Sequence, residues 1–62
     1  MSMLEHKILQ VIKTRTDEGK VTSKNQLVKL LGIPEKPVKE AILDLKARNL
    51  IKGSPRSLKV VN

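Results

Sequence analysis

The chain has 62 residues, contains no cysteine, phenylalanine, tyrosine or tryptophan, and carries thirteen Lys and Arg against six Asp and Glu, a formal net charge of +7. A chain of this size buries only about 60% of the surface that its unfolded form exposes, so we expect a single domain over residues 1–62 with a small aliphatic core and no internal catalytic cavity. The composition excludes disulfides and a thiolate zinc site, and no apolar run approaches the roughly 20 residues that span a bilayer.

The first helix is predicted to begin directly after Ser2, because Ser2 and Glu5 have the spacing of a capping box. Apolar residues then recur at helical spacing and form one stripe, which consists of Leu4, Ile8, Val11 and Ile12. The Asp-Glu-Gly sequence at 17–19 ends this helix. Residues 20–22 are expected to form a short extended link that directs Val21 inward.

A second, shorter helix follows. Ser23 and Gln26 repeat the capping pattern, and Gly32 supplies the left-handed residue that ends the helix. The apolar positions of this helix are Leu27, Leu30 and Leu31.

A third helix is predicted directly after a tight turn at Ile33-Pro34. Glu35 is favourable at its N-terminus, and Pro37 is tolerated there because the amides of a first turn have no partner within the helix. Ala41 permits close approach of a neighbouring element, and Asn49 can take the left-handed conformation that ends the helix. The buried face consists of Val38, Ile42 and Leu45.

After Asn49 the apolar pattern changes to that of strands. Residues 50–52 and 58–61 predict two strands, joined by the turn-rich loop 53–57 into a β-hairpin. Three helices followed by a hairpin make a small α+β fold, the winged helix-turn-helix, in which the hairpin is the wing. The expected core consists of Leu4, Ile8, Val11, Ile12, Val21, Leu27, Leu31, Ile33, Val38, Ile42, Leu45, Ile51, Leu58 and Val60.

The positive charge is concentrated in one part of the chain. Residues 1–18 are neutral overall, so the net charge of +7 belongs to residues 19–62, and residues 45–62 contain no acidic residue. A one-sided field of this kind favours polyanionic partners. The alternative interpretation is a basic surface that serves solubility.

The sequence resembles the DNA-binding domain of GntR-type repressors. The resemblance rests on S-K-N-Q-L-V-K-L-L-G at 23–32 and on P-V-K-E-A-I at 37–42. It implies a winged helix that binds duplex DNA and regulates transcription. Two family arginines that contact DNA are replaced here by Asn25 and Glu35, and the large effector-binding domain of the family is absent.

The scaffold is also similar to that of Zα domains, which bind left-handed Z-form nucleic acid. The matching residues are E-H-K-I-L at 5–9, Gly32 with Pro34, Lys36, and S-P-x-x-L-K-V at 54–60. This resemblance places Ser54 and Pro55 in a wing that contacts nucleic acid. The family's helix asparagine and tyrosine are Lys39 and Leu43 here, and its wing tryptophan is Leu58.

Lys36, Lys39 and Leu43 share one face of the third helix, opposite its buried residues, and this is the face expected to meet DNA. The two lysines can donate to guanine O6 or N7 or contact phosphates, and Leu43 can contact a thymine methyl group or a sugar. The alternative is a solvated face stabilised by pairs of opposite charge at i and i+4. These pairs are Glu35 with Lys39, Lys36 with Glu40, and Asp44 with Arg48.

Further candidates for nucleic-acid binding lie in the wing and at the start of the second helix. Lys52, Arg56 and Lys59 lie on or beside the wing loop, and Arg56 at its tip is the candidate for a minor-groove or phosphate contact. Lys24 and Asn25 begin the second helix, where backbone amides can bind a phosphate. A charged, solvated loop is the alternative interpretation of the wing.

The sequence offers little for an enzyme. The only histidine, His6, lies between Glu5 and Lys7 on the first helix, and the three glycines are too dispersed to bind a phosphate. We expect no catalytic residues, no metal and no cofactor.

The sequence therefore predicts a nucleic-acid-binding protein, cytoplasmic or in the nucleoid or nucleus, that binds duplex DNA as a transcription regulator or DNA-organising factor. The absence of aromatic residues argues against base stacking on single strands. Three alternatives remain: binding of Z-form nucleic acid, binding of RNA, and a winged helix that binds another protein. A homodimer on a palindromic site is a further option, and no membrane partner is expected.

Overall fold

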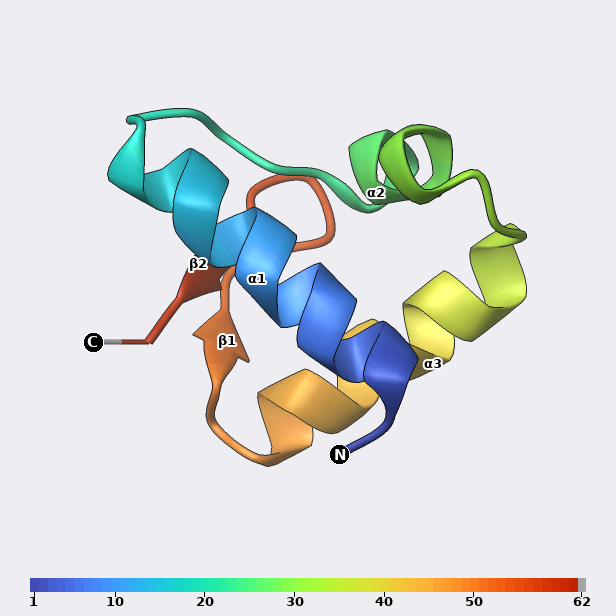
Figure 1. The fold of residues 1–62 in the computed structure, drawn as a ribbon. Coiled ribbons are helices and arrows are strands. Elements are labelled where there is room, and N and C mark those ends of the chain that lie inside the picture. The colour runs from blue at the N-terminus through green and yellow to red at the C-terminus, as the bar shows by residue number, and fades with distance from the viewer. Residues whose placement is uncertain (62) are drawn as a thin grey trace.

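The computed structural model describes residues 1–61 as three helices followed by a two-stranded antiparallel hairpin (Figure 1). The helices are α1 (Met3–Asp17), α2 (Lys24–Leu31) and α3 (Glu35–Ala47), and the strands are β1 (Ile51–Lys52) and β2 (Lys59–Val60). This order confirms the small α+β layout expected from the sequence.

The first two helices begin where their capping signals predict. The Ser2 hydroxyl accepts a hydrogen bond from the Glu5 amide, and the Glu5 side chain accepts one from the Ser2 amide. Ser23 and Gln26 make the same reciprocal pair at the start of α2. Gly32 has a φ of 64°, so α2 ends in the predicted left-handed residue.

The third helix begins at Glu35 after Pro34, which provides no side-chain cap. Asn49 has a φ of 60° and is the only non-glycine residue with positive φ in the described part of the chain. The chain thus leaves α3 in the predicted left-handed conformation and turns back toward the hairpin.

The core lies between α1, α3 and the hairpin, and α2 packs against α3 (Figure 1). The buried hydrophobic residues are Ile8, Ile12, Leu27, Val38, Ala41, Ile42, Leu45, Ile51 and Leu58. The partly buried residues packed around them are Leu4, Leu9, Val11, Val28, Leu31, Ile33, Leu50 and Val60. The aliphatic stripes of the three helices therefore meet in one cluster, as their spacing predicts.

The link between α1 and α2 differs from the prediction. Val21 is 55% exposed, whereas Thr22 is fully buried. Thr22 forms an antiparallel bridge with Leu58, and its carbonyl accepts a hydrogen bond of 2.8 Å from the Leu58 amide. Because neighbouring residues of an extended chain point to opposite sides, this bridge turns Thr22 inward and Val21 outward.

The two strands are shorter than expected, although their pairing extends one step further. Ile51 pairs with Val60 and Lys52 with Lys59, and the Val61 amide donates to the Leu50 carbonyl at 3.1 Å. Thr22 adds a single bridge at the other end of the hairpin. The hairpin is thus held against the helices at the point where the chain enters α2.

Candidate nucleic-acid interface

The outward face of α3 contains the three residues that the sequence singled out. Lys36, Lys39 and Leu43 are all exposed, and Leu43 keeps 57% of its surface in solvent. They lie opposite Val38 and Ile42, which are buried in the core. This face therefore presents two exposed lysines and one exposed apolar side chain.

The hairpin presents two further lysines. Lys52 and Lys59 are directly opposite each other in the register, one step from the pair of Ile51 and Val60. Directly paired residues project on the same face, and Ile51 is buried, so the two lysines project from the outer face. Both are exposed.

The wing loop lies against the start of α2. The Lys24 amide donates to the Pro55 carbonyl at 2.8 Å, and the Ser57 amide closes the loop by donating to the Ser54 carbonyl at 2.9 Å. A shallow pocket of about 160 Å³ separates the two segments. Its lining residues are Ser23, Lys24, Asn25, Pro55 and Arg56.

This pocket brings together four of the predicted site residues, from segments about thirty positions apart in the chain. Asn25 and Arg56 are exposed at it. The amides at the start of α2 are largely committed, because Lys24 donates to Pro55 and Gln26 donates to the Ser23 hydroxyl. The Lys24 and Gln26 amides are therefore not open to an anion at this place.

Lys24 has a partner that the sequence did not reveal. Its ammonium group forms an ion pair with Glu35, the first residue of α3, and only 23% of its side chain is exposed. The hydrogen bond from Lys24, and then its charge, lower the pKa of Glu35. The pair joins the start of α2 to the start of α3. Lys24 therefore helps to hold the pocket in place.

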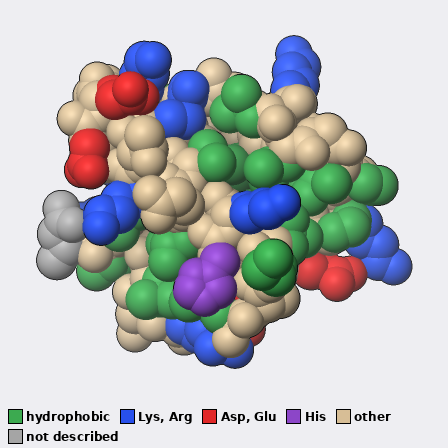
Figure 2. All heavy atoms as spheres, in the orientation of Figure 1, with side chains coloured by type: hydrophobic (Ala, Val, Ile, Leu, Met, Phe, Trp, Pro, Cys, Tyr) green, Lys and Arg blue, Asp and Glu red, His purple; other side chains and the backbone are tan. Residues whose placement is uncertain are grey.

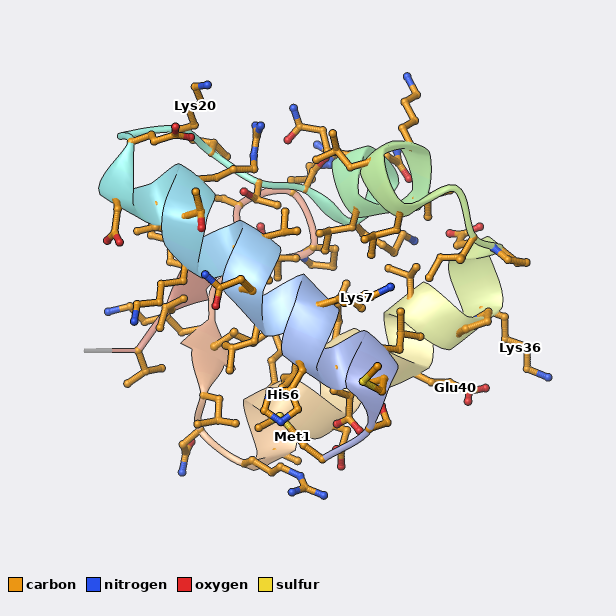
Figure 3. The ribbon with its side chains drawn as sticks, in the orientation of Figure 1. Met1, His6, Lys7, Lys20, Lys36 and Glu40 are labelled. Atoms are coloured by element: carbon orange, nitrogen blue, oxygen red, sulfur yellow. The ribbon has the colours of Figure 1, made fainter. Side chains whose placement is uncertain are left out.

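The three ion pairs expected along α3 fare differently. Arg48 donates to Asp44 at 3.0 Å, as predicted. Glu35 pairs with Lys24 instead of Lys39. Lys36 and Glu40 extend outward from α3 (Figure 3), and among residues 1–61 they form no ion pair with each other.

Helical spacing does not predict the Lys24–Glu35 pair, because it relates only charges that lie four positions apart on one helix. The two residues lie eleven positions apart, on two helices. The available signal was the tight turn at Gly32–Pro34, since a turn this short brings the ends of two helices close together.

His6 lies on the exposed side of α1 (Figure 3). Among the described residues, no group of three or more histidine, cysteine or acidic side chains is arranged to hold a metal ion. None of the helices in this part of the chain has the length and apolar character needed to cross a membrane.

Comparison with known protein families, with curated proteins and with solved structures gave no match.

Proposed function

We propose that the protein binds duplex DNA through a surface made of the outward face of α3, the hairpin and the wing loop. The proposed interface consists of Asn25, Lys36, Lys39, Leu43, Lys52, Ser54, Pro55, Arg56 and Lys59, with Lys24 as the residue that positions α2 against α3. The observation that carries the proposal is the grouping of exposed cations on these elements, in a chain whose net charge is +7.

The third helix is the element proposed to enter the major groove. Its first two turns carry Lys36 and Lys39 on the exposed face, within reach of base edges or of the flanking phosphates. Leu43, one turn further along, offers an apolar contact to a thymine methyl group or a sugar. Such a surface gains most of its affinity from phosphates and only part from the bases.

The wing is proposed to contact the backbone beside the groove. Arg56 lies at the pocket shared with Asn25, where its guanidinium group can donate two parallel hydrogen bonds to two oxygens of a phosphate. Lys52 and Lys59 add two cations on the outer face of the hairpin. A protein of this kind serves as a transcription regulator or as a DNA-organising factor.

The proposal is tested with the variants Lys39→Ala and Arg56→Ala. Each removes one cation that is proposed to contact a phosphate, so we expect weaker binding and a salt slope smaller by about one unit. Fluorescence anisotropy with a labelled duplex, measured between about 50 and 200 mM salt, gives both quantities. Lys13→Ala, an exposed lysine on α1, is the matched control and should leave the slope unchanged.

Unchanged affinity in both variants for every nucleic acid tested contradicts the proposed interface. The same assay with Z-prone alternating CG duplex, single strands and RNA identifies the preferred ligand. Inversion of the circular dichroism of the CG duplex would assign Z-form binding instead. A complex with another protein that hardly responds to salt would assign the docking function, with Leu43 as its apolar anchor.

A further inference from the structure

A groove between α1 and α2 lies outside the proposed nucleic-acid interface. Its volume is about 410 Å³, and its surface is mainly apolar. The lining residues are Gln10, Val11, Thr14, Arg15, Leu30 and Leu31, none of which belongs to the interface proposed above. The groove therefore calls for an explanation of its own.

Leu30 is the exposed wall of this groove. It keeps 58% of its surface in solvent, although Leu27 and Leu31 of the same helix pack into or against the core. A single exposed leucine is common, but this one continues into Val11 and Leu31 at the groove floor. Together they present a joined apolar strip between two helices.

The opposite end of the groove is rigid because Arg15 is fixed by three hydrogen bonds. Its guanidinium group donates to the Thr22 hydroxyl at 2.9 Å, to the Val21 carbonyl at 2.9 Å and to the Gln26 side chain at 3.3 Å. These contacts hold the ends of α1 and α2 together. A groove formed in advance in this way loses little conformational entropy when a ligand binds.

The one charged residue that lines the groove is basic, Arg15. None of its lining residues is acidic, and α2 contains no acidic residue at all. Lys7 precedes Val11 by four residues on α1, which places it one turn away on the same side of the helix. Lys7 extends from α1 (Figure 3), and in the same orientation a basic side chain near the centre of the face lies beside hydrophobic ones (Figure 2).

We propose that this groove binds an amphipathic helix of another protein, with leucine-type side chains on its inner face and Asp or Glu at its edges. Apolar side chains would bind along Leu30 and Val11, and the acidic edges would meet Lys7 and Arg15. Binding of a helix by an apolar groove with complementary charges at its rim is a common mode of peptide recognition.

A second copy of the chain does not meet this description. Each copy carries a net charge of +7, so two copies repel each other. The exposed large apolar side chains of the three helices in the described residues, Met3, Leu30 and Leu43, lie on different helices, and no helix presents a second exposed apolar stripe to a copy of the chain. The occupant is therefore a different and acidic chain.

The test begins with display selection of a library of helix-forming peptides of about 18 residues, long enough for five turns. We expect the selected peptides to combine leucines at helical spacing with flanking Asp and Glu. Their binding should shift the amide resonances of Val11, Leu30 and Leu31 in the 15N–1H spectrum of the intact protein.

Two variants locate the binding. Leu30→Ser should weaken a selected peptide at least tenfold, and Lys7→Glu should weaken it by a similar factor. Met3→Ser is the matched control, because Met3 is an exposed apolar residue of α1 that lies outside both the groove and the proposed interface, and it should change peptide affinity less than twofold. The amide spectrum of each variant confirms that the fold is retained.

The inference is overturned if the selection yields no binder, if the binders are not acidic, or if Leu30→Ser binds them as well as the original protein. It is also overturned if sedimentation shows a dimer that Leu30→Ser dissociates, since the groove would then bind a second copy. Duplex binding by Leu30→Ser is measured in parallel. It should be unchanged, so failure of this inference is distinguishable from failure of the proposed DNA binding.

Discussion

Lys24 and Glu35 show how one ion pair can change the role of a predicted site residue. The sequence predicts that Lys24 binds a phosphate. In the structure its ammonium group is paired with Glu35, and its backbone amide donates to the Pro55 carbonyl. Two contacts of this kind make Lys24 a link between α2, α3 and the wing loop. Asn25 and Arg56 are then the side chains at the pocket that remain available for an anion.

The Lys24–Glu35 pair makes a prediction about pH. Because Lys24 lowers the pKa of Glu35 in the folded protein, the ionised carboxylate contributes stability above the unfolded pKa of about 4.3. This contribution is lost as the pH falls through the lower, folded pKa. Urea unfolding between about pH 6 and pH 2 should therefore show a steeper loss of stability in the original protein than in Glu35→Gln.

Carboxyl titration by NMR measures the pKa of Glu35 directly. Lys24→Met should return the pKa of Glu35 toward its ordinary value, whereas Lys39→Met should change it less, because the hydrogen bond and charge of Lys24 are the main causes of the shift. A pKa of Glu35 that does not respond to Lys24→Met would contradict the ion pair.

At this scale the sequence predicts positions better than partners. The exposed lysines of α3 and the Asp44–Arg48 pair follow from helical spacing alone. The partner of Lys24 could not be predicted in this way, because it depends on how two helices meet across a turn.

The helices are the elements most completely encoded in local sequence. The starts of α1 and α2 follow from capping residues, and the ends of α2 and α3 follow from Gly32 and Asn49, each of which acts within a few positions along the chain. The link at residues 20–22 has no such local signal. Its orientation depends on a bridge to Leu58, a residue 36 positions after Thr22, so local sequence does not indicate that Thr22 rather than Val21 points inward.

The wing depends on one glycine in particular. Gly53 has a φ of 99°, and a Cβ atom at this position would collide with the carbonyl oxygen of Ser57. Gly19 also has a positive φ, of 75°, but a Cβ atom there would meet nothing within 4 Å. A side chain at Gly19 would therefore cause backbone strain alone, whereas a side chain at Gly53 would cause backbone strain and a steric clash.

We expect Gly53→Ala to lower the free energy of unfolding by about 3 kcal/mol and Gly19→Ala by about 1 kcal/mol, since only the first adds a clash to the cost of the left-handed conformation. Urea unfolding monitored by circular dichroism measures both. Equal losses in the two variants would show that the loop relaxes around the new methyl group.

The whole molecule combines a small core with a large excess of positive charge. Domains of this length have a total stability of only a few kcal/mol, because a single small aliphatic core supplies little more. The described residues contain three ion pairs, all with at least one exposed partner, against a net charge of +7. Repulsion among the remaining cations is then significant compared with the total free energy of unfolding.

Sodium chloride should therefore stabilise the free protein. Raising it from about 10 to about 200 mM shortens the range of the repulsion, and we expect the melting temperature to rise by about 5 °C, which corresponds to about 1 kcal/mol for a domain of this size. Differential scanning calorimetry measures the effect. Lys52→Glu, which lowers the net charge from +7 to +5, should show a smaller rise, and a fall in either protein would contradict the argument.

The register of the hairpin carries a last consequence. Lys52 and Lys59 are directly opposite each other in two strands of two residues each. The backbone hydrogen bonds of the hairpin therefore bring two positive charges together, and their repulsion destabilises the hairpin when no anion is bound. Ile51 and Leu58 are buried in the core and anchor the two strands on either side of this lysine pair. A polyanion between the two ammonium groups would reverse the sign of that term, so binding and closure of the hairpin become a single linked equilibrium.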